Sequence, residues 1–285
     1  MASFRTFLFA PGDREDLTAK VSRAGADAAV LDLEDAVATA NKSAAREKVA
    51  TALGAAHDCP IYVRINARDT DAAFADLMAV CRSGLAGIVL PKIESAADAI
   101  AVDWVIGNLE RDRGCPPGSI DLMPIVETAK GIAALRAFAR HLPARVKRLS
   151  FGAGDYTVDC GMTWSRDEAE LAHARAEVVV ASRMAEREPP IDSVYARLDD
   201  EDGFRASVAR IRDLGFQGKL CIHPKQIGPA HDVFRPENAE LANARRIIAA
   251  FDEAEAQGRA SIQIDGQFVD YPIVAAARRT IARAR

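Results

Sequence analysis

The sequence has few of the features that mark secreted, membrane-spanning or metal-finger proteins. Its cysteines are odd in number and none stands close to another, which disfavours both a disulfide framework and a zinc site. They are Cys59, Cys81, Cys115, Cys160 and Cys221. No charged-then-apolar segment precedes the first apolar run, and no apolar run approaches the length of a membrane span. We therefore expect a soluble, cytoplasmic protein with no membrane partner.

An excess of positive charge is absent as well. The chain has 37 Lys and Arg against 41 Asp and Glu, and no basic run stands out, so we expect no nucleic-acid partner. A glycine-rich dinucleotide turn is also missing, because the first apolar run ends in PGDR. What remains is a chain of 285 residues that is 49% hydrophobic, which suits one α/β barrel or a domain with an appendage.

Short apolar runs recur along most of the chain, and all but the last are followed within a few residues by a helical pattern. There are eight, in the segments 6–13, 25–37, 59–70, 86–95, 120–131, 148–156, 191–200 and 218–224. Near-continuous apolar runs are typical of parallel strands covered on both faces. We predict a (β/α)8 TIM barrel over residues 1–228 and a C-terminal helical extension over 229–285, packed on a neighbouring subunit. An open doubly wound sheet is the alternative, but the dinucleotide turn that would support it is missing.

Charged residues gather at the predicted C-terminal ends of the strands, which is where barrels carry their functional groups. The set comprises Asp32, Glu34, Asp35, Arg64, Lys92, Glu94, Glu127, Asp155 and His223. Glu127 and Asp155, at the ends of successive strands, form a candidate metal pair, because Mg2+ prefers one or two protein carboxylates. Arg64 offers a bidentate fork for a substrate carboxylate. The residues alone predict a metal-dependent barrel enzyme that acts on an anionic small molecule.

Each of these residues also has a structural interpretation. A carboxylate at a strand end can cap the helix that follows. Clustered acids need compensation, so at least one of the acids in 32–35 is expected to pair with Arg64 or Lys92. His223 either supports the fold or lines the site.

Seven motifs follow one another in the order and spacing of a known family. They are LFAPGDR, GADAAVLDLEDAV, YVRINARDT, IVLPKIES, PIVETAKG, SFGAGDYTVDCG and GKLCIHPKQI. The chain thus resembles the citrate lyase β-subunit-like proteins of the HpcH/HpaI aldolase superfamily. The resemblance covers nearly the whole chain, including a DGQFVDYP segment at 265–272. It identifies a family but no single substrate.

The resemblance implies a lyase dependent on Mg2+, or on Mn2+, that breaks or makes a C–C bond between an acyl-CoA thioester and a 2-oxo acid. In similar proteins the glutamate of the ET motif and the aspartate of the GxxD motif bind the metal; these match Glu127 and Asp155, and Glu127 thereby holds the substrate. The arginine of the RIN motif, here Arg64, contacts substrate and stabilises the developing enolate. An aspartate from the adjacent subunit covers the site as part of a lid and exchanges the proton on the enolate carbon; its match is Asp270.

The resemblance further implies a homo-oligomer, as a trimer or hexamer, and contacts with CoA. The loops after the first and last strands lie near CoA in similar proteins, which makes Arg14, Lys20 and Lys225 candidate phosphate contacts. Many relatives have an acidic residue directly before the GxxD aspartate, where this chain has Gly154. This departure leaves the metal assignment in place and alters the charge beside it.

Three activities stay open at this point. The first is cleavage of a 3-hydroxyacyl-CoA such as malyl-CoA or citryl-CoA by the chain alone. A CoA-independent 2-oxo acid aldolase keeps the same site without CoA. A β-subunit that works only within a citrate-lyase-type complex is the third, although the DGQFVDYP tail favours a self-sufficient enzyme.

Overall fold

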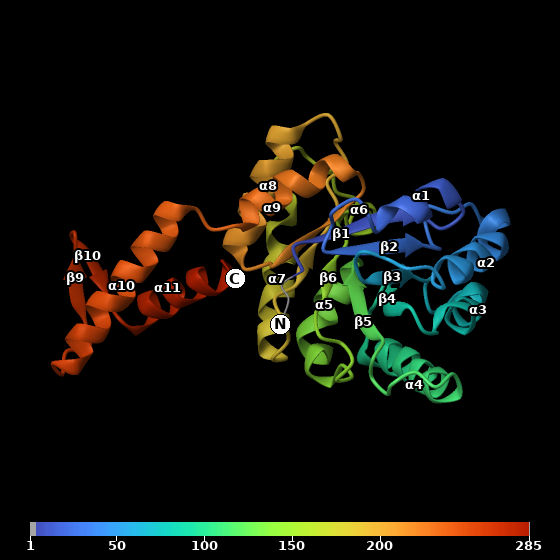
Figure 1. Ribbon diagram of the computed structural model, residues 1–285, viewed down its shortest axis with the longest axis horizontal. Coiled ribbons are helices and arrows are strands. Elements are labelled where there is room, and N and C mark those ends of the chain that lie inside the picture. Colours follow the sequence, from blue (N-terminus) through green and yellow to red (C-terminus); the bar gives the residue numbers. More distant parts are fainter. Residues whose placement is uncertain (1–3, 285) are drawn as a thin grey trace. The chain divides into compact units, whose positions relative to one another are not determined.

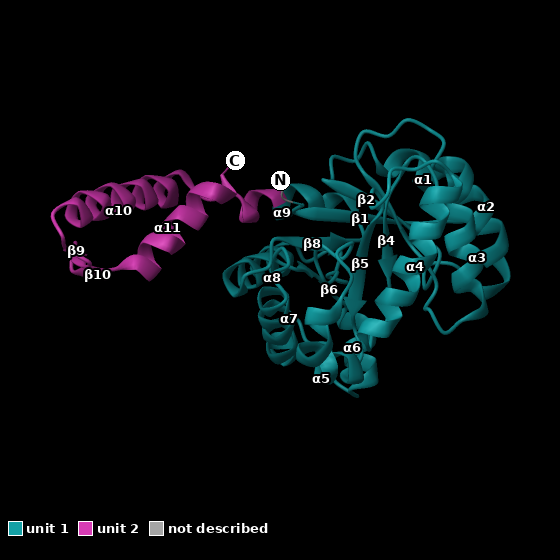
Figure 2. Ribbon diagram, turned by 90° about the horizontal axis from the view of Figure 1, so that it is seen from below, with its two compact units in different colours: residues 1–230 teal, residues 231–285 magenta. Residues whose placement is uncertain are grey.

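The structure is a computed structural model that describes residues 4–284. The chain divides into two compact units, one ending at Ala230 and the other beginning at His231 (Figure 2). None of the helices in the described part combines the length and the apolar character needed to cross a membrane.

The first unit is a closed barrel of eight parallel strands in the order β1 to β8 (Figure 1). The strands are β1 (Thr6–Pro11), β2 (Ala28–Asp32), β3 (Ile61–Arg64), β4 (Leu85–Leu90), β5 (Asp121–Val126), β6 (Ser150–Phe151), β7 (Ile191–Asp192) and β8 (Gly218–Cys221). Strand β8 pairs with β1, with Phe7 opposite Leu220, and this pairing closes the barrel. The (β/α)8 prediction is confirmed, and the open-sheet alternative is wrong.

Helices follow the strands, and most of those in the first unit cover the outside of the barrel (Figure 1). They are α1 (Glu15–Val21), α2 (Lys42–Ala52), α3 (Asp71–Val80), α4 (Ala96–Asp112), α5 (Ala129–Phe138), α6 (Ala153–Asp159), α7 (Ala172–Met184), α8 (Glu201–Leu214) and α9 (Ile227–Phe234). Several begin at a side-chain cap: Thr128 accepts a hydrogen bond from the Gly131 amide, and Asp200 accepts one from Gly203. These caps end the strand-to-helix loops, which surround the barrel mouth at the C-terminal ends of the strands.

Apolar side chains fill the barrel interior. Its core comprises Phe7, Ala28, Val30, Tyr62, Val89, Met123, Ile125, Ile191 and Leu220, all buried. Where a strand contributes two of them, as β2 and β5 do, the two stand two residues apart, which is the spacing of one strand face. The interior is thus a packed core, and polar chemistry is confined to the strand ends.

Three predicted elements differ from the structure. The sixth strand has only two residues, and α6 begins at Ala153, so Asp155 lies in the first turn of a helix instead of at a strand end. The seventh strand is equally short. The helical pattern expected after the sixth apolar run divides into α6 and α7, and a 3-10 turn (Ala169–Leu171) precedes α7 directly after Glu168, which adopts a left-handed conformation with φ of 54°.

The second unit pairs two helices with a small hairpin. It contains α10 (Asn238–Ala256), β9 (Ile262–Ile264), β10 (Gln267–Val269) and α11 (Tyr271–Arg283). Asp265 and Gly266 both have positive φ, 50° and 83°, which is the backbone of a tight type I′ hairpin turn. Apolar residues of α10, β10 and α11, among them Phe251 and Val269, form a separate core. The role of the second unit as a lid for a neighbouring subunit stays a prediction.

Candidate active site

The pleat of three barrel strands directs charged side chains into the barrel mouth. On β2, β3 and β5 the residue two positions beyond an inward-facing core residue is Asp32, Arg64 and Glu127, respectively. Because side chains two apart share a strand face, all three follow the core residues inward. They line a cavity of about 470 Å3 together with Asp155. The predicted strand-end cluster is therefore brought together at one place.

The rest of the cavity wall is mostly apolar. Its further lining residues are Phe9, Ala10, Pro11, Asp35, Ala36, Ile125, Gly152, Gly154, Ser193, Val194, Leu220 and Ile222. A pocket with apolar walls and a few convergent charged groups is the usual form of a small-molecule site.

Arg64 is held in place by two acids. Its Nε and Nη2 atoms donate to Asp32 Oδ1 and Oδ2 at 2.8 and 2.6 Å, and its Nη1 lies 2.9 Å from Glu34 Oε2. Burial alone would lower the pKa of Arg64, but the hydrogen bonds and charges of Asp32 and Glu34 raise it above its ordinary value. Asp32 also accepts the Glu34 and Ala36 amides, so it shapes the loop after β2. Arg64 is a fixed cation whose role toward substrate stays a prediction.

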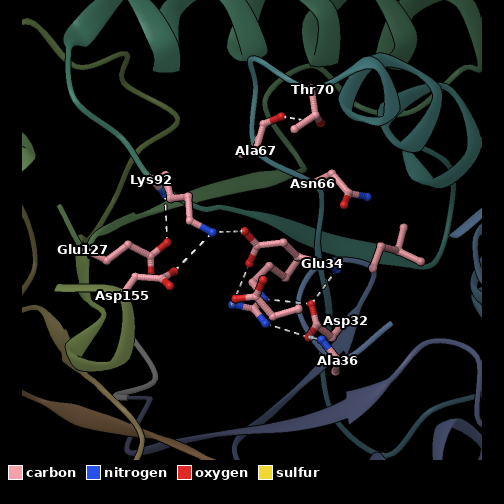
Figure 3. Close-up of polar contacts among 12 residues, drawn as sticks. Asp32, Glu34, Ala36, Asn66, Ala67, Thr70, Lys92, Glu127 and Asp155 are labelled. Atoms are coloured by element: carbon pink, nitrogen blue, oxygen red, sulfur yellow. Dashed lines mark hydrogen bonds and ion pairs between the residues drawn. The ribbon is translucent and has the colours of Figure 1, made fainter. Parts of the chain in front are cut away.

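Lys92 connects three acids from different strands (Figure 3). Its Nζ lies 2.5 Å from Glu34 Oε1 and 3.2 Å from Asp155 Oδ2, and its backbone N–H donates to Glu127 Oε1 at 2.9 Å. Burial would lower the pKa of Lys92, and the Glu34 and Asp155 carboxylates outweigh that effect and raise it. The ammonium group is therefore charged at any physiological pH. The expectation that Arg64 or Lys92 compensates the acids near residue 34 is confirmed.

Glu127 is almost fully buried, with 4% of its surface exposed. Burial and the nearby charges of Glu34 and Asp155 raise the pKa of its carboxyl group to about 8, while the Arg64 charge opposes the rise. The groups around Glu127 thus balance only part of the negative charge of its ionised carboxylate. A cation placed between Glu127 and Asp155 would balance this charge and lower the pKa.

Asp155 reaches the site from the first turn of α6, and its side chain is one-third exposed. The start of this helix is anchored from β7, because the Ala153 amide donates to Ser193 Oγ at 2.7 Å. A carboxylate in the first helical turn is also favoured by the helix dipole. Asp155 was predicted at the end of a strand and lies instead in a helix, but it still reaches the expected site and lies beside Lys92.

The donor set fits a magnesium ion. Within residues 4–284 no three His, Cys, Asp or Glu side chains gather closely enough to hold a metal by themselves. Mg2+ keeps several waters or substrate oxygens and takes only one or two carboxylates, which Glu127 and Asp155 would supply. Five carboxylates, those of Asp32, Glu34, Asp35, Glu127 and Asp155, lie near two cations, Arg64 and Lys92, which leaves three negative charges when all are ionised. A divalent cation would balance most of that charge.

The remaining predicted site residues lie outside the cavity lining. His223 follows β8 and its Nδ1 accepts the Lys225 amide at 3.1 Å, so it caps a short turn. Arg14 is exposed and pairs with Asp16 at 3.0 Å. Lys20 lies in the last turn of α1, at the end of the helix away from the β1 loop. The contacts of Arg14, Lys20 and Lys225 with CoA phosphates stay predictions.

Two further predicted residues serve local structure. Glu94 contacts the loop after β5, where it accepts from Thr128 at 3.1 Å and pairs with Lys130 at 2.7 Å. Asp270 belongs to the second unit, at the N-cap of α11, where its Oδ1 accepts the Ile273 amide at 3.4 Å.

Sequence reasoning missed the support beneath Glu34. Lys42 Nζ donates to the carbonyls of Leu33 and Glu34 at 3.0 and 2.9 Å and to Asn66 Oδ1 at 2.6 Å. Asn66 in turn donates its amide and side-chain N–H groups to Asp76 Oδ2. In the sequence Lys42 looks like an ordinary lysine at the start of a helix, so no sequence pattern predicts this network of hydrogen bonds.

Similarity to known proteins agrees with this geometry. The "Citrate lyase subunit beta" of Leuconostoc mesenteroides subsp. cremoris is 35% identical, covering 98% of this chain and 93% of its own. The "(3S)-malyl-CoA thioesterase" of Cereibacter sphaeroides (strain ATCC 17023) is 35% identical over 99% of this chain and 94% of its own. The crystal structure of CitE from Mycobacterium tuberculosis with magnesium, acetoacetate and coenzyme A superposes with a TM-score of 0.80 at 31% identity, covering 99% and 98% of the two chains. The family model of the HpcH/HpaI aldolase/citrate lyase proteins matches residues 5–224. The chain belongs to the HpcH/HpaI aldolase/citrate lyase family.

Proposed function

We propose that the protein is a Mg2+-dependent carbon–carbon lyase of the oxo-acid-lyase type. It cleaves a 3-hydroxyacyl-CoA thioester, such as malyl-CoA or citryl-CoA, into an acyl-CoA and a 2-oxo acid, or runs the reverse condensation. The observation that supports it best is that Glu127 and Asp155 line one cavity together with the largely buried Arg64. The solved relative that contains magnesium, acetoacetate and coenzyme A supports the metal and the CoA moiety in this proposal.

Cleavage shifts two bonding pairs, one from the O–H bond into the new C=O bond and one from the C2–C3 bond to C2, and it moves two protons. The 3-hydroxyl group loses its proton, the C2–C3 bond breaks, and C3 becomes the carbonyl carbon of the 2-oxo acid. The bonding pair passes to C2 and forms the thioester enolate, which takes up a proton at C2. When bound to Glu127 and Asp155, Mg2+ supplies Lewis acidity toward the oxygens of the 2-oxo acid.

Two residues of the chain act on the enolate. Arg64, held rigidly by Asp32 and Glu34, presents a positive charge that stabilises the developing oxyanion without reorganising. Asp270 of a neighbouring copy delivers the proton to C2, or removes it in condensation. The working form is accordingly a homo-oligomer, a trimer or hexamer, in the cytoplasm. Arg14, Lys20 and Lys225 contact the CoA phosphates.

The decisive experiment is turnover by the purified chain alone. Malyl-CoA, methylmalyl-CoA and citryl-CoA are incubated side by side with Mg2+, and both the 2-oxo acid and free thiol are measured. Release of 2-oxo acid without free thiol supports the lyase. Thiol release as well would add hydrolysis of the thioester, as the name of the Cereibacter relative suggests.

Two outcomes favour the alternatives. Cleavage of a free 2-oxo acid aldol with no competition by CoA would indicate the CoA-independent aldolase. Turnover only after addition of partner subunits would indicate a β-subunit, in line with the name of the Leuconostoc relative. No turnover under any of these conditions, with the metal bound, would reject the lyase proposal.

A further inference from the structure

Within residues 4–284, Lys92 is the one residue that forms a hydrogen bond or an ion pair with each of the two proposed metal ligands. Its ammonium group pairs with Asp155 at 3.2 Å, and its backbone N–H holds Glu127 Oε1 at 2.9 Å. The same ammonium lies 2.5 Å from Glu34 Oε1. Figure 3 shows the side chain extended between Glu34 and Asp155, with the backbone turned toward Glu127.

The backbone at Lys92 adopts a conformation that a lysine rarely takes. Its φ is 53°, in the left-handed region that favours glycine. The pairing of β4 with β5 runs up to Leu90 opposite Pro124 and resumes where the Ile93 amide donates to the Ile125 carbonyl. The intervening residues bulge from the ladder, and this bulge turns the Lys92 amide toward Glu127. A strained conformation kept at a site implies that the position has a use.

The charge of Lys92 fits a role in the metal-free site. Glu34, Glu127 and Asp155 would repel one another if no cation stood among them, and Lys92 reaches all three. Its contact with Asp155 uses a carboxylate that a metal ion would also need. A metal ion bound there would lie close to the ammonium, and the two positive charges would repel each other.

We propose that Lys92 is a positioning residue that substitutes for the metal's charge when the site is empty. It keeps Glu127 and Asp155 in place between turnovers, and it weakens metal binding because its positive charge lies beside the metal ligands and repels the ion. The inference extends the proposed function, since it takes Glu127 and Asp155 to be the metal ligands.

The proposal predicts two effects of opposite direction in Lys92→Met. Without metal the variant unfolds at a lower temperature than the native protein, because the acids lose their cation. The variant should also bind the metal ion at least about tenfold more tightly than the native protein, because a positive charge within 4 Å of Asp155 is gone. A purely structural lysine would lower the unfolding temperature and would not strengthen metal binding.

The probe is Mn2+ alone, titrated into full-length protein stripped with EDTA, with binding followed by calorimetry and by the unfolding temperature. Lys130→Met is the matched control, because Lys130 pairs with Glu94 on an exposed part of the rim and contacts neither ligand. Its Mn2+ affinity is expected to equal that of the native protein. Lys92→Gly provides a second variant, because glycine accepts the left-handed backbone and keeps the N–H to Glu127. It too should bind Mn2+ more tightly.

The outcomes separate this inference from the proposed function. Tighter binding in both Lys92 variants supports the inference. Unchanged or weaker binding in either variant, with normal binding by the native protein, overturns it and leaves the lyase proposal standing. A native protein that binds no Mn2+ overturns the metal assignment and both proposals with it.

Discussion

The carboxylate of Glu127 occupies space that only a glycine at residue 152 leaves free. A β-carbon on Gly152 would lie 2.2 Å from Glu127 Oε2 and 2.6 Å from Glu127 Cβ. Both distances are far below van der Waals contact, so any larger residue would push Glu127 from its place. The glycine two residues further along has no such neighbour, because the nearest atom to a β-carbon on Gly154 is Trp164 Cζ3 at 3.8 Å. These two glycines make a matched pair for testing the position of Glu127.

Gly152→Ala should weaken Mg2+ binding by about tenfold or more and lower the free energy of unfolding by about 1–3 kcal/mol. Gly154→Ala should leave both nearly unchanged, since alanine fits there and suits the first turn of a helix. Metal titration and urea unfolding of both variants provide the measurement. Equal behaviour of the two alanine variants would contradict the proposed position of Glu127.

Glu127→Gln should abolish Mg2+-dependent turnover while the fold stays intact. The amide keeps the shape and can still accept the Lys92 N–H, but it loses the charge that would hold the ion. Turnover with each CoA thioester and circular dichroism of the variant make the test. Full activity in a folded variant would remove Glu127 from the metal site.

The pH dependence of stability should reveal the raised pKa of Glu127 when metal is absent. Its carboxyl group has a pKa of about 8 in the folded protein against an ordinary value of 4.5, so the folded state binds this proton more tightly than the unfolded state. Stability from this group is thus fully present below pH 4.5 and is lost as pH rises through 8. The native protein in EDTA should lose stability across this window relative to Glu127→Gln, by up to about 1.4 kcal/mol per pH unit.

Denaturant unfolding at intervals from pH 5 to pH 9 measures the difference, and excess Mg2+ should abolish it. Parallel pH profiles for the native protein and Glu127→Gln would show that the carboxyl group titrates normally.

Arg64→Lys should be costly although the charge is conserved. A lysine cannot form the two parallel bonds to Asp32 and also reach Glu34, which leaves buried carboxylate oxygens unpaired. We expect a loss of roughly 3 kcal/mol in stability and of about 100-fold in kcat/KM. Arg136→Lys is the control, because Arg136 forms a bidentate pair with Glu177 at the surface and should lose less than about 1 kcal/mol.

Mixing two inactive variants should restore activity if the site is shared between copies. Asp270→Asn retains a capping residue at the start of α11, so the second unit should keep its fold. Asp270→Asn and Glu127→Gln are each expected to be inactive alone. Unfolded and refolded together, they should form oligomers in which some sites have both native residues. Activity that stays at zero in the mixture, or that Asp270→Asn keeps alone, would contradict the shared site.

The barrel and the place of Glu127 could be predicted because both depend on local patterns. A buried six-residue run precedes Glu127, and the alternation of its side chains determines which way the next acid points. Asp155 was assigned to the wrong element because a two-residue strand leaves almost no pattern, and the glycines around it do not mark where the helix begins. The pairing of Lys92 with Glu34 was expected from charge compensation. Its contacts with Glu127 and Asp155 could not be predicted, because they depend on a left-handed backbone at a non-glycine residue.

The charged and the apolar residues of the cavity wall come from opposite sides of the barrel. The charged groups come from the β2, β3, β5 and β6 segments, whereas β7, β8 and β1 contribute mainly apolar side chains such as Val194, Leu220, Ile222 and Phe9. Bond breaking and recognition of the acyl group would then depend on separate sets of residues. Substitutions on the apolar side can alter the length or branching of the accepted acyl chain while the charged side stays intact. One catalytic apparatus could in this way serve several thioesters among its relatives.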